Sequence, residues 1–173
     1  MKLLLHMCCA PCSIFIVDDL IEQGIKFEGL FYNPNIQPIE EFKRRCDNVK
    51  ILSEQKDFNV SYDDKFMQNE WESFGGSEQE RCTMCYQIRM DKVAEFAKEN
   101  GFTAFTTSLL ISPYQQHDLI IELCEKAAKK YGVQFYYKDY RQSFRLGQQM
   151  ARDAGLYRQK YCGCILSYEN RGK

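Results

Sequence analysis

The sequence predicts an α/β protein with a mostly parallel sheet flanked by helices. Two observations favour this class: short apolar runs alternate with amphipathic helical stretches, and Gly, Pro or Asn residues separate many of them. Strands that alternate with helices form βαβ units, in which successive strands lie parallel. No linker, repeat or low-complexity tract interrupts the 173 residues, so we expect residues 1–173 to form a single domain.

The expected strands are short and mostly apolar. In chain order they are Leu3–Met7, Phe27–Tyr32, Val60–Tyr62, Phe102–Leu110 and Val133–Tyr137. Open parallel sheets place their binding sites at the carboxyl ends of the strands. The segments that follow these strands are therefore where functional residues are expected.

The expected helices carry apolar residues three or four positions apart, which lie on one helix face. They are Ile14–Glu22, Pro38–Phe58, Tyr86–Asn100, Gln115–Tyr131 and Phe144–Ala154. Pro38 suits a helix start because its missing N–H would lack a partner there, and Gly101 suits a helix end. Residues 65–81 are less regular. An irregular basic tail is expected over about residues 156–173, because no period is visible after Leu156.

Composition and segment length bear on the compartment. Apolar runs such as Ile14–Val17 are much shorter than the roughly 18 residues of a membrane span. The N-terminus lacks the length and cleavage pattern of a signal peptide. The sequence therefore predicts a cytoplasmic protein with no membrane partner. Thiols stay reduced in that compartment, so nine cysteines indicate metal or redox chemistry rather than structural disulfides.

Charge is distributed unevenly along the chain. Residues 138–173 carry eight Lys/Arg against three Asp/Glu, whereas residues 1–137 carry fifteen against twenty-one. A basic section beside an acidic body is compatible with a polyanionic partner such as nucleic acid. An unevenly charged but merely solvated surface would give the same numbers.

The first cysteine group, Cys8, Cys9 and Cys12, directly follows the first expected strand. Adjacent cysteines form a strained disulfide, but both can reach a metal cluster. Pro11 stiffens the loop, and the helix that begins near Cys12 or Ser13 favours thiolate. The group therefore predicts a metal or redox site at this strand end.

Two further cysteine pairs follow. Cys82 and Cys85 form a C-x2-C pair at the head of the helix predicted from Tyr86, with Arg81 and Arg89 beside it to offset anionic charge. That spacing suits zinc, a cluster or a redox dithiol. Cys162 and Cys164 flank a glycine and form either a second metal-binding arm or a redox-active dithiol.

The other candidate metal ligands have simpler interpretations. Cys46 and Cys124 lie in apolar helical stripes and are expected to be small buried residues. His6 is expected to be a packed histidine, with a ligand role as the alternative. Seven cysteines in three groups exceed what one structural zinc needs. No G-x-x-x-x-G-K-[ST] phosphate loop is present, which argues against ATP-driven chemistry.

Candidate substrate contacts follow two of the strands and continue in the tail. Tyr32, Asn33 and Asn35 follow the second strand, and Ser112 lies after a later one. Basic residues of the C-terminal section alternate with tyrosines that can stack on bases: Arg141, Arg145, Arg152, Arg158, Lys160, Tyr140, Tyr157 and Tyr161. A structural turn and a solvated basic face are the alternatives.

Four segments together resemble the QueH-type epoxyqueuosine reductases: His6–Cys12, Tyr32–Ile36, Arg81–Cys85 and Leu156–Cys164. The resemblance implies a HUP-type α/β three-layer fold, related to PP-loop enzymes without their nucleotide loop. It also implies reduction of epoxyqueuosine to queuosine at the tRNA wobble position, with an external electron donor and no ATP. That reaction takes two electrons and two protons and releases water.

The resemblance and the cysteine pattern together give a set of expected roles. Cys8, Cys9, Cys82 and Cys85 are expected to hold a [4Fe–4S] cluster. Cys162 and Cys164, with Cys12, are expected to bind an adjacent mononuclear iron or to form a redox disulfide. Tyr161 or a water is the expected proton donor, and Arg81 joins the substrate contacts. The alternatives are a cluster-dependent tRNA thiolase or desulfidase and a zinc-binding RNA adaptor.

Overall fold

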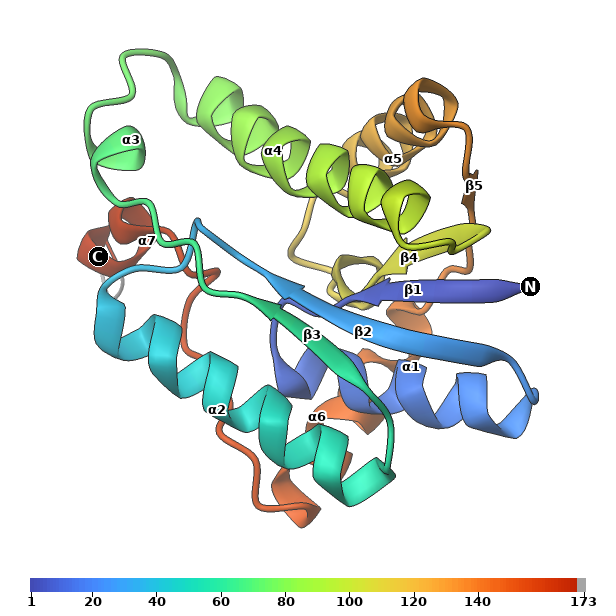
Figure 1. The fold of residues 1–173 in the computed structure, drawn as a ribbon. Coiled ribbons are helices and arrows are strands. Elements are labelled where there is room, and N and C mark those ends of the chain that lie inside the picture. The colour runs from blue at the N-terminus through green and yellow to red at the C-terminus, as the bar shows by residue number, and fades with distance from the viewer. Residues whose placement is uncertain (171–173) are drawn as a thin grey trace.

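A computed structural model describes residues 1–170, so the last three residues of the predicted tail lie outside the described part of the chain. Its centre is a five-stranded sheet in the order β3-β2-β1-β4-β5 (Figure 1). Every neighbouring pair of strands is parallel. The strands are β1 (Lys2–His6), β2 (Lys26–Tyr32), β3 (Val60–Asp63), β4 (Ala104–Thr107) and β5 (Gln134–Phe135).

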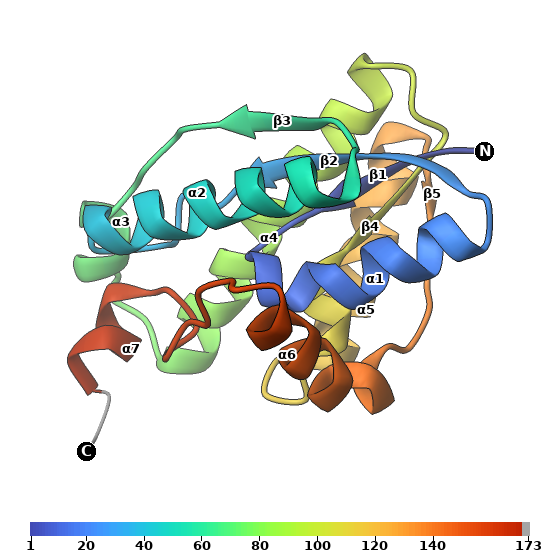
Figure 2. The same cartoon turned by 90° about the horizontal axis from the view of Figure 1, so that it is seen from below.

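Helices cover both faces of the sheet and make three layers, as Figures 1 and 2 show. The helices are α1 (Ala10–Glu22), α2 (Ile39–Lys56), α3 (Asn69–Glu72), α4 (Glu78–Glu99), α5 (His117–Tyr131), α6 (Phe144–Asp153) and α7 (Ile165–Asn170), with the 3-10 turns η1 (Ser108–Ile111) and η2 (Arg141–Ser143). One face carries α4 and α5, and the other carries α1, α2 and α6. The predicted α/β class is thereby confirmed.

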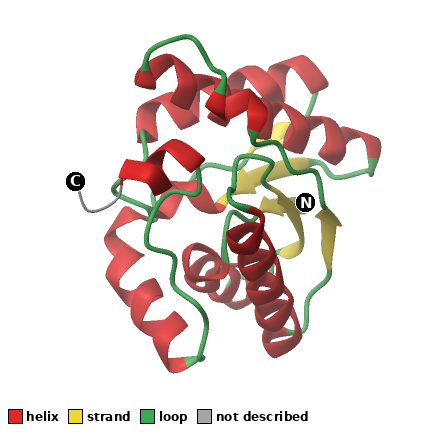
Figure 3. Ribbon diagram, turned by 90° about the vertical axis from the view of Figure 1, so that its left-hand side faces the viewer, coloured by secondary structure: helices red, strands yellow, loops and turns green. Residues whose placement is uncertain are grey.

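Burial explains why the central strand is apolar on both sides. Leu3, Leu4 and Leu5 of β1 have no exposed surface, because helices cover the sheet above and below. In Figure 3 the molecule is seen from the end where these strands finish, and many of the connecting loops gather there. No helix among residues 1–170 is long and apolar enough to cross a bilayer.

Several predicted boundaries are wrong. Helix α4 begins at Glu78, eight residues before the predicted start, because Ser77 and Glu80 form a reciprocal capping box. Helix α1 begins at Ala10, with Cys9 as its N-cap, rather than near Cys12 or Ser13. The positions of Cys8, Cys9 and Cys12 and of the Cys82–Cys85 pair therefore depend on two helix starts that the apolar periodicity did not locate.

Two more corrections concern the second half of the chain. The strand predicted over Phe102–Leu110 ends at Thr107 and continues as the 3-10 turn η1. The irregular tail is irregular only as far as Cys164, because Ile165–Asn170 forms helix α7. Its Ile165 packs with Trp71, Cys85 and Cys164 in a small apolar cluster apart from the main core.

A thiol-lined candidate active site

Two adjoining cavities open at the end of the sheet where the strands finish. The larger has a volume of about 520 Å³ and the smaller about 40 Å³. Both are lined by residues from the β2–α2 loop, from α4 and from the tail, including Asn35, Cys82, Arg89 and Cys162. The site therefore lies where a parallel sheet is expected to place one.

Cys8, Cys9 and Cys12 form a three-thiol group at the junction of β1 and α1. Their Sγ atoms all lie within 4.8 Å of one another. The hydroxyl of Ser108 donates to Cys8 Sγ at 3.0 Å and also accepts from the Cys8 backbone N–H at 2.9 Å. Hydrogen bonds from Cys12, Cys9 and Ser108 lower the pKa of Cys8. The site thus favours one thiolate at Cys8 before any metal binds.

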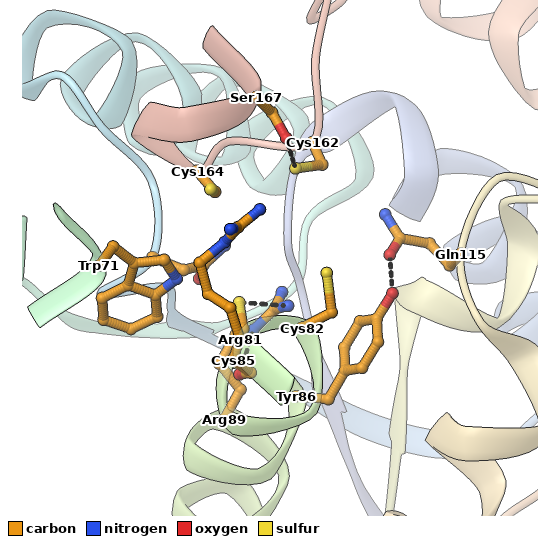
Figure 4. Close-up of a pocket in the computed structure, with 11 residues that line it drawn as sticks. Trp71, Arg81, Cys82, Cys85, Tyr86, Arg89, Gln115, Cys162, Cys164 and Ser167 are labelled. Atoms are coloured by element: carbon orange, nitrogen blue, oxygen red, sulfur yellow. Dashed lines mark hydrogen bonds between the residues drawn. The ribbon is translucent and has the colours of Figure 1, made fainter. Parts of the chain in front are cut away.

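Cys82, Cys85, Cys162 and Cys164 form a four-thiol group around the smaller cavity (Figure 4). Cys82 and Cys85 are three residues apart on α4, so they lie on one helix face. The other two come from the tail. A hydrogen bond from Cys164 lowers the pKa of Cys162 to about 5, and Cys162 Sγ also lies 3.1 Å from Ser167 Oγ. Four thiols from two segments thus meet at one small cavity.

Arg89 supplies positive charge between the two thiol groups. Its side chain is buried and lines both cavities, and its Nη2 donates to Cys85 Sγ at 3.3 Å. Within residues 1–170, no carboxylate lies within ion-pairing distance of this guanidinium. Burial of an unpaired cation is costly, and Cys85 and Cys8 are the nearby groups whose ionised forms would offset that charge and raise the pKa of Arg89. The charge-offsetting role of Arg89 stays a prediction, which its burial beside Cys85 supports.

Arg45 on α2 fixes the tail in place. Its Nη1 and Nη2 donate to the carbonyl oxygens of Cys162 and Tyr161 at 3.0 and 2.8 Å, while Nε pairs with Glu41 at 2.8 Å. The other Glu41 oxygen accepts from the Tyr157 hydroxyl at 2.8 Å. A buried ion pair therefore orients the backbone beside the tail cysteines.

The β2–α2 loop forms a second set of tail contacts. Gln37 N–H donates to the Gly163 carbonyl at 2.7 Å, and Gln37 Oε1 accepts from Ile165 N–H at 2.7 Å. The Tyr161 hydroxyl donates to the Gln37 carbonyl. Gly163 has φ +126°, and an added Cβ would lie 3.1 Å from Arg45 Nη1. The backbone conformation thus requires glycine between the tail cysteines, and a side chain there would also be tight against Arg45 and Ile36.

The remaining predicted metal-ligand candidates are mainly structural. His6 is buried and bonds Thr107 Oγ1 at 2.9 Å and the Tyr32 carbonyl at 3.0 Å, and burial lowers its pKa to about 4. The packed-histidine interpretation fits these contacts. Cys124 is fully buried, as predicted, whereas Cys46 is only half-buried against the core. Neither of these two cysteines lines either cavity.

Some predicted substrate residues reach the cavities and others do not. Asn33, Asn35, Ser112 and Tyr161 line the larger cavity, and Arg81 lines the smaller. Asn33 also has a structural role, since its Nδ2 donates to the Met7 carbonyl at 2.9 Å. Seven of the predicted contacts line neither cavity: Tyr32, Tyr140, Arg141, Arg145, Arg152, Tyr157 and Arg158. Arg141 is paired with Asp139 at 2.7 Å, and Tyr157 is bonded to Glu41.

Several cavity residues were not predicted as functional. Gln159 donates to Cys9 Sγ at 2.8 Å, and its Oε1 is buried with no partner among residues 1–170. Asn35 Oδ1 also lacks a partner in the described chain, and the Trp71 indole N–H acts on Cys85 as a hydrogen-bond donor; both residues line the smaller cavity. Gln159 stood in the Leu156–Cys164 motif, which was the available signal. Trp71 gave none.

The fold and this site define a class: a parallel α/β protein whose thiol-lined cavity is suited to hold metal at the strand ends. The chain belongs to the family described as epoxyqueuosine reductase QueH, whose model matches residues 3–170. This family membership confirms the resemblance seen in the four sequence segments.

Individual relatives agree with the family match over nearly the whole chain. Curated proteins called epoxyqueuosine reductase QueH are 35% identical in Dehalococcoides mccartyi (99% of this chain, 96% of the relative) and 36% identical in Haemophilus influenzae (99% and 74%). The Thermotoga maritima protein is 32% identical (97% and 91%). A deacetylase from the biosynthesis pathway of teicoplanin shares the fold alone, with TM-score 0.52, 9% identity and coverage of 89% of this chain and 83% of that one. The narrower HUP-type assignment stays a prediction.

Proposed function

We propose that the protein reduces epoxyqueuosine to queuosine in tRNA. The observation that carries the proposal is that six cysteines line two adjoining cavities, the larger about 520 Å³ in volume, and that a seventh, Cys9, lies within 4.8 Å of Cys8 and Cys12. That size lies in the range of small-molecule sites, roughly 300–1,000 Å³. Removal of the epoxide oxygen as water leaves an alkene and consumes two electrons and two protons. The electrons come from an external donor.

We propose that the four-thiol group holds a [4Fe–4S] cluster and the three-thiol group holds an adjacent iron. The donor set fits, because four thiolates are the usual ligands of such clusters and four thiols line the smaller cavity. The Trp71 indole N–H at that cavity is a donor suited to sulfur, since burial raises the pKa of Cys85 and the hydrogen bond from Trp71 lowers it. The bound metals would supply electrons one at a time and a Lewis acid for oxygen.

A different division follows from the sequence. It gives the cluster to Cys8, Cys9, Cys82 and Cys85, and leaves Cys12, Cys162 and Cys164 as the second redox element. The lowered pKa of Cys162 would also suit a redox disulfide with Cys164. The spatial grouping supports the first division, since Cys9 lies against Cys8 and Cys12 and does not line the smaller cavity. The experiments below separate the two.

The protein's own polar groups are proposed to position the modified base. Asn35 Oδ1 and Gln159 Oε1 are buried acceptors without a partner in residues 1–170, and both residues line the larger cavity. Such acceptors suit the hydroxyl groups of the cyclopentane ring, because an unpaired buried oxygen is costly until a ligand pairs with it. Tyr161 is the proposed proton donor, with water as the alternative. Burial raises the pKa of its phenol, which keeps the proton on oxygen.

The test is conversion in vitro. Anaerobically reconstituted protein, a reductant and tRNA that carries epoxyqueuosine should yield queuosine in the nucleoside digest by mass spectrometry. Cys124→Ser is the matched control, because Cys124 lies in the core and lines neither cavity, and it should convert at nearly the normal rate. No conversion by iron-loaded protein would overturn the proposal. Stoichiometric zinc without iron would favour the RNA adaptor.

A further inference from the structure

We propose that Tyr114 and Phe144 form a stacking platform for an unpaired RNA base at the mouth of the larger cavity. The base would be a neighbour of the modified nucleotide in the anticodon loop, and this identity rests on the proposed function. Tyr114 is 84% exposed, the highest value among the exposed large hydrophobic side chains of the described chain. A residue that lines a cavity and is still this exposed lies at its entrance.

Hydrogen bonds hold Tyr114 itself and the two residues that follow it. Tyr114 N–H donates to Ser112 Oγ at 3.2 Å. The Tyr86 hydroxyl donates to Gln115 Oε1 at 2.5 Å and accepts from Gln116 N–H at 3.3 Å. The backbone is therefore fixed before any ligand arrives, so ordering this segment adds little entropic cost to binding.

Phe144, the first residue of α6, lies beside Tyr114 and lines the same cavity. The ring centroids are 5.7 Å apart and the ring planes meet at 85°. Phe144 is half-buried and packs against the main core, so it supports the Tyr114 ring, whose own surface is 84% exposed and open to a further aromatic partner. The two side chains thus form a corner in which Phe144 is the half-buried support and Tyr114 provides the open aromatic surface.

The charges around this corner suit RNA. Lys160 lines the larger cavity and is exposed, and the exposed Arg145 directly follows Phe144. Glu78 also lines the cavity and is the local charge of opposite sign. Aromatic side chains next to basic residues are the usual arrangement for binding single-stranded nucleic acid, where bases stack and phosphates pair with cations.

The depth of the thiols explains why a neighbouring base needs a partner. Cys8 and Cys12 are only 9% and 6% exposed, so a nucleotide must leave the anticodon stack to reach them. Extrusion unstacks the adjacent base and exposes its face, which is energetically costly. A rigid aromatic ring at the entrance compensates for that loss, while the amide side chains inside the cavity bind the modified base itself.

The test uses metal-loaded protein and an anticodon stem-loop RNA with 2-aminopurine on either side of the wobble position. Stacking on Tyr114 should quench the fluorescence of one label, and Tyr114→Ala should abolish this quenching and weaken RNA binding about ten-fold. Tyr114→Phe should behave like the native protein. Tyr62→Ala is the control, because Tyr62 is 38% exposed on β3 and lines neither cavity.

Each other outcome is decisive. Unchanged quenching and affinity in Tyr114→Ala would overturn the platform. Native protein that binds the RNA without quenching either label, or that does not bind the RNA, would also overturn it. If quenching depends on Tyr114 but epoxyqueuosine is not converted by iron-loaded protein, the proposed reductase function falls and the RNA platform stands.

Discussion

Cys8, Cys9 and Cys12 lie where strand β1 ends and helix α1 begins, whereas Cys162 and Cys164 lie in a tail segment before α7. The first group is positioned by regular backbone structure in the centre of the molecule. The second is positioned by side chains of other elements, chiefly Arg45 and Gln37. The first group should therefore persist as long as the sheet persists, while the tail pair can be released by single substitutions.

The largest effect is expected from loss of Cys8. Cys8→Ser removes the thiolate that Ser108 and the neighbouring thiols stabilise, and the rate of epoxyqueuosine reduction should fall by at least about 100-fold. Rate and bound iron are measured together, with Cys124→Ser as the control. An active Cys8→Ser protein would show that the three-thiol group is structural.

A loss of about 10- to 100-fold in activity is expected when the tail contact is broken. Arg45→Gln removes the donors to the Tyr161 and Cys162 carbonyls and leaves Glu41 buried without its cation, which costs roughly 3–5 kcal/mol. The tail should become sensitive to limited proteolysis while the circular dichroism of the core is retained. Arg44→Gln, which changes an arginine stacked on Tyr157, is the control. Equal protease resistance of the tail in the two variants would contradict the claim that Arg45 holds the tail cysteines in place.

A smaller effect is expected from Arg89, which lies between the two regions. Arg89→Gln removes an unpaired buried cation 3.3 Å from Cys85 Sγ, so the reduced, more negative form of a bound cluster loses stabilisation. Its reduction potential should fall by about 60 mV, equivalent to roughly a ten-fold change in equilibrium constant. Arg89→Lys should restore part of the potential. A redox titration followed by electron paramagnetic resonance measures both, and an unchanged potential would show that the guanidinium does not compensate cluster charge.

The smallest effect is expected at the start of α4. Ser77→Ala removes the capping box and should lower the free energy of unfolding by about 1 kcal/mol. Activity at low temperature should stay near normal, because Cys82 lies more than one helical turn into the helix. Thermal unfolding measures the change. A loss of iron in this variant would mean that the helix start fixes the cysteine pair more directly than its capping role implies.

The sequence and the structure agree best where the signal is local. Alternating strands and helices predicted the parallel sheet, and the cysteine spacing located three thiol segments. The capping box at Ser77 and Glu80 was readable in the sequence, yet apolar periodicity alone placed the start of α4 eight residues too late. The error at α4 has this cause, because helix ends depend on capping groups that carry no apolar period, whereas Cys9, the N-cap of α1, makes no side-chain capping hydrogen bond.

The grouping of the thiols could not be predicted, because it depends on long-range contacts. The Arg45–Glu41 pair has the spacing of an ordinary surface ion pair on a helix, and only its contact with Cys162, 117 residues away, shows its role. Trp71 similarly reaches the smaller cavity through packing with α7 residues. The spacing of the cysteines in the sequence predicts which residues belong to the site, whereas the tertiary fold decides which of their thiols lie close together.

The most direct test of the two-group arrangement is Mössbauer spectroscopy of 57Fe-reconstituted Cys164→Ser and Cys9→Ser. The arrangement predicts that Cys164→Ser loses the [4Fe–4S] signal, while Cys9→Ser keeps it and loses only the adjacent iron. Loss of the cluster in Cys9→Ser with retention in Cys164→Ser would contradict the arrangement and favour a cluster held by Cys8, Cys9, Cys82 and Cys85.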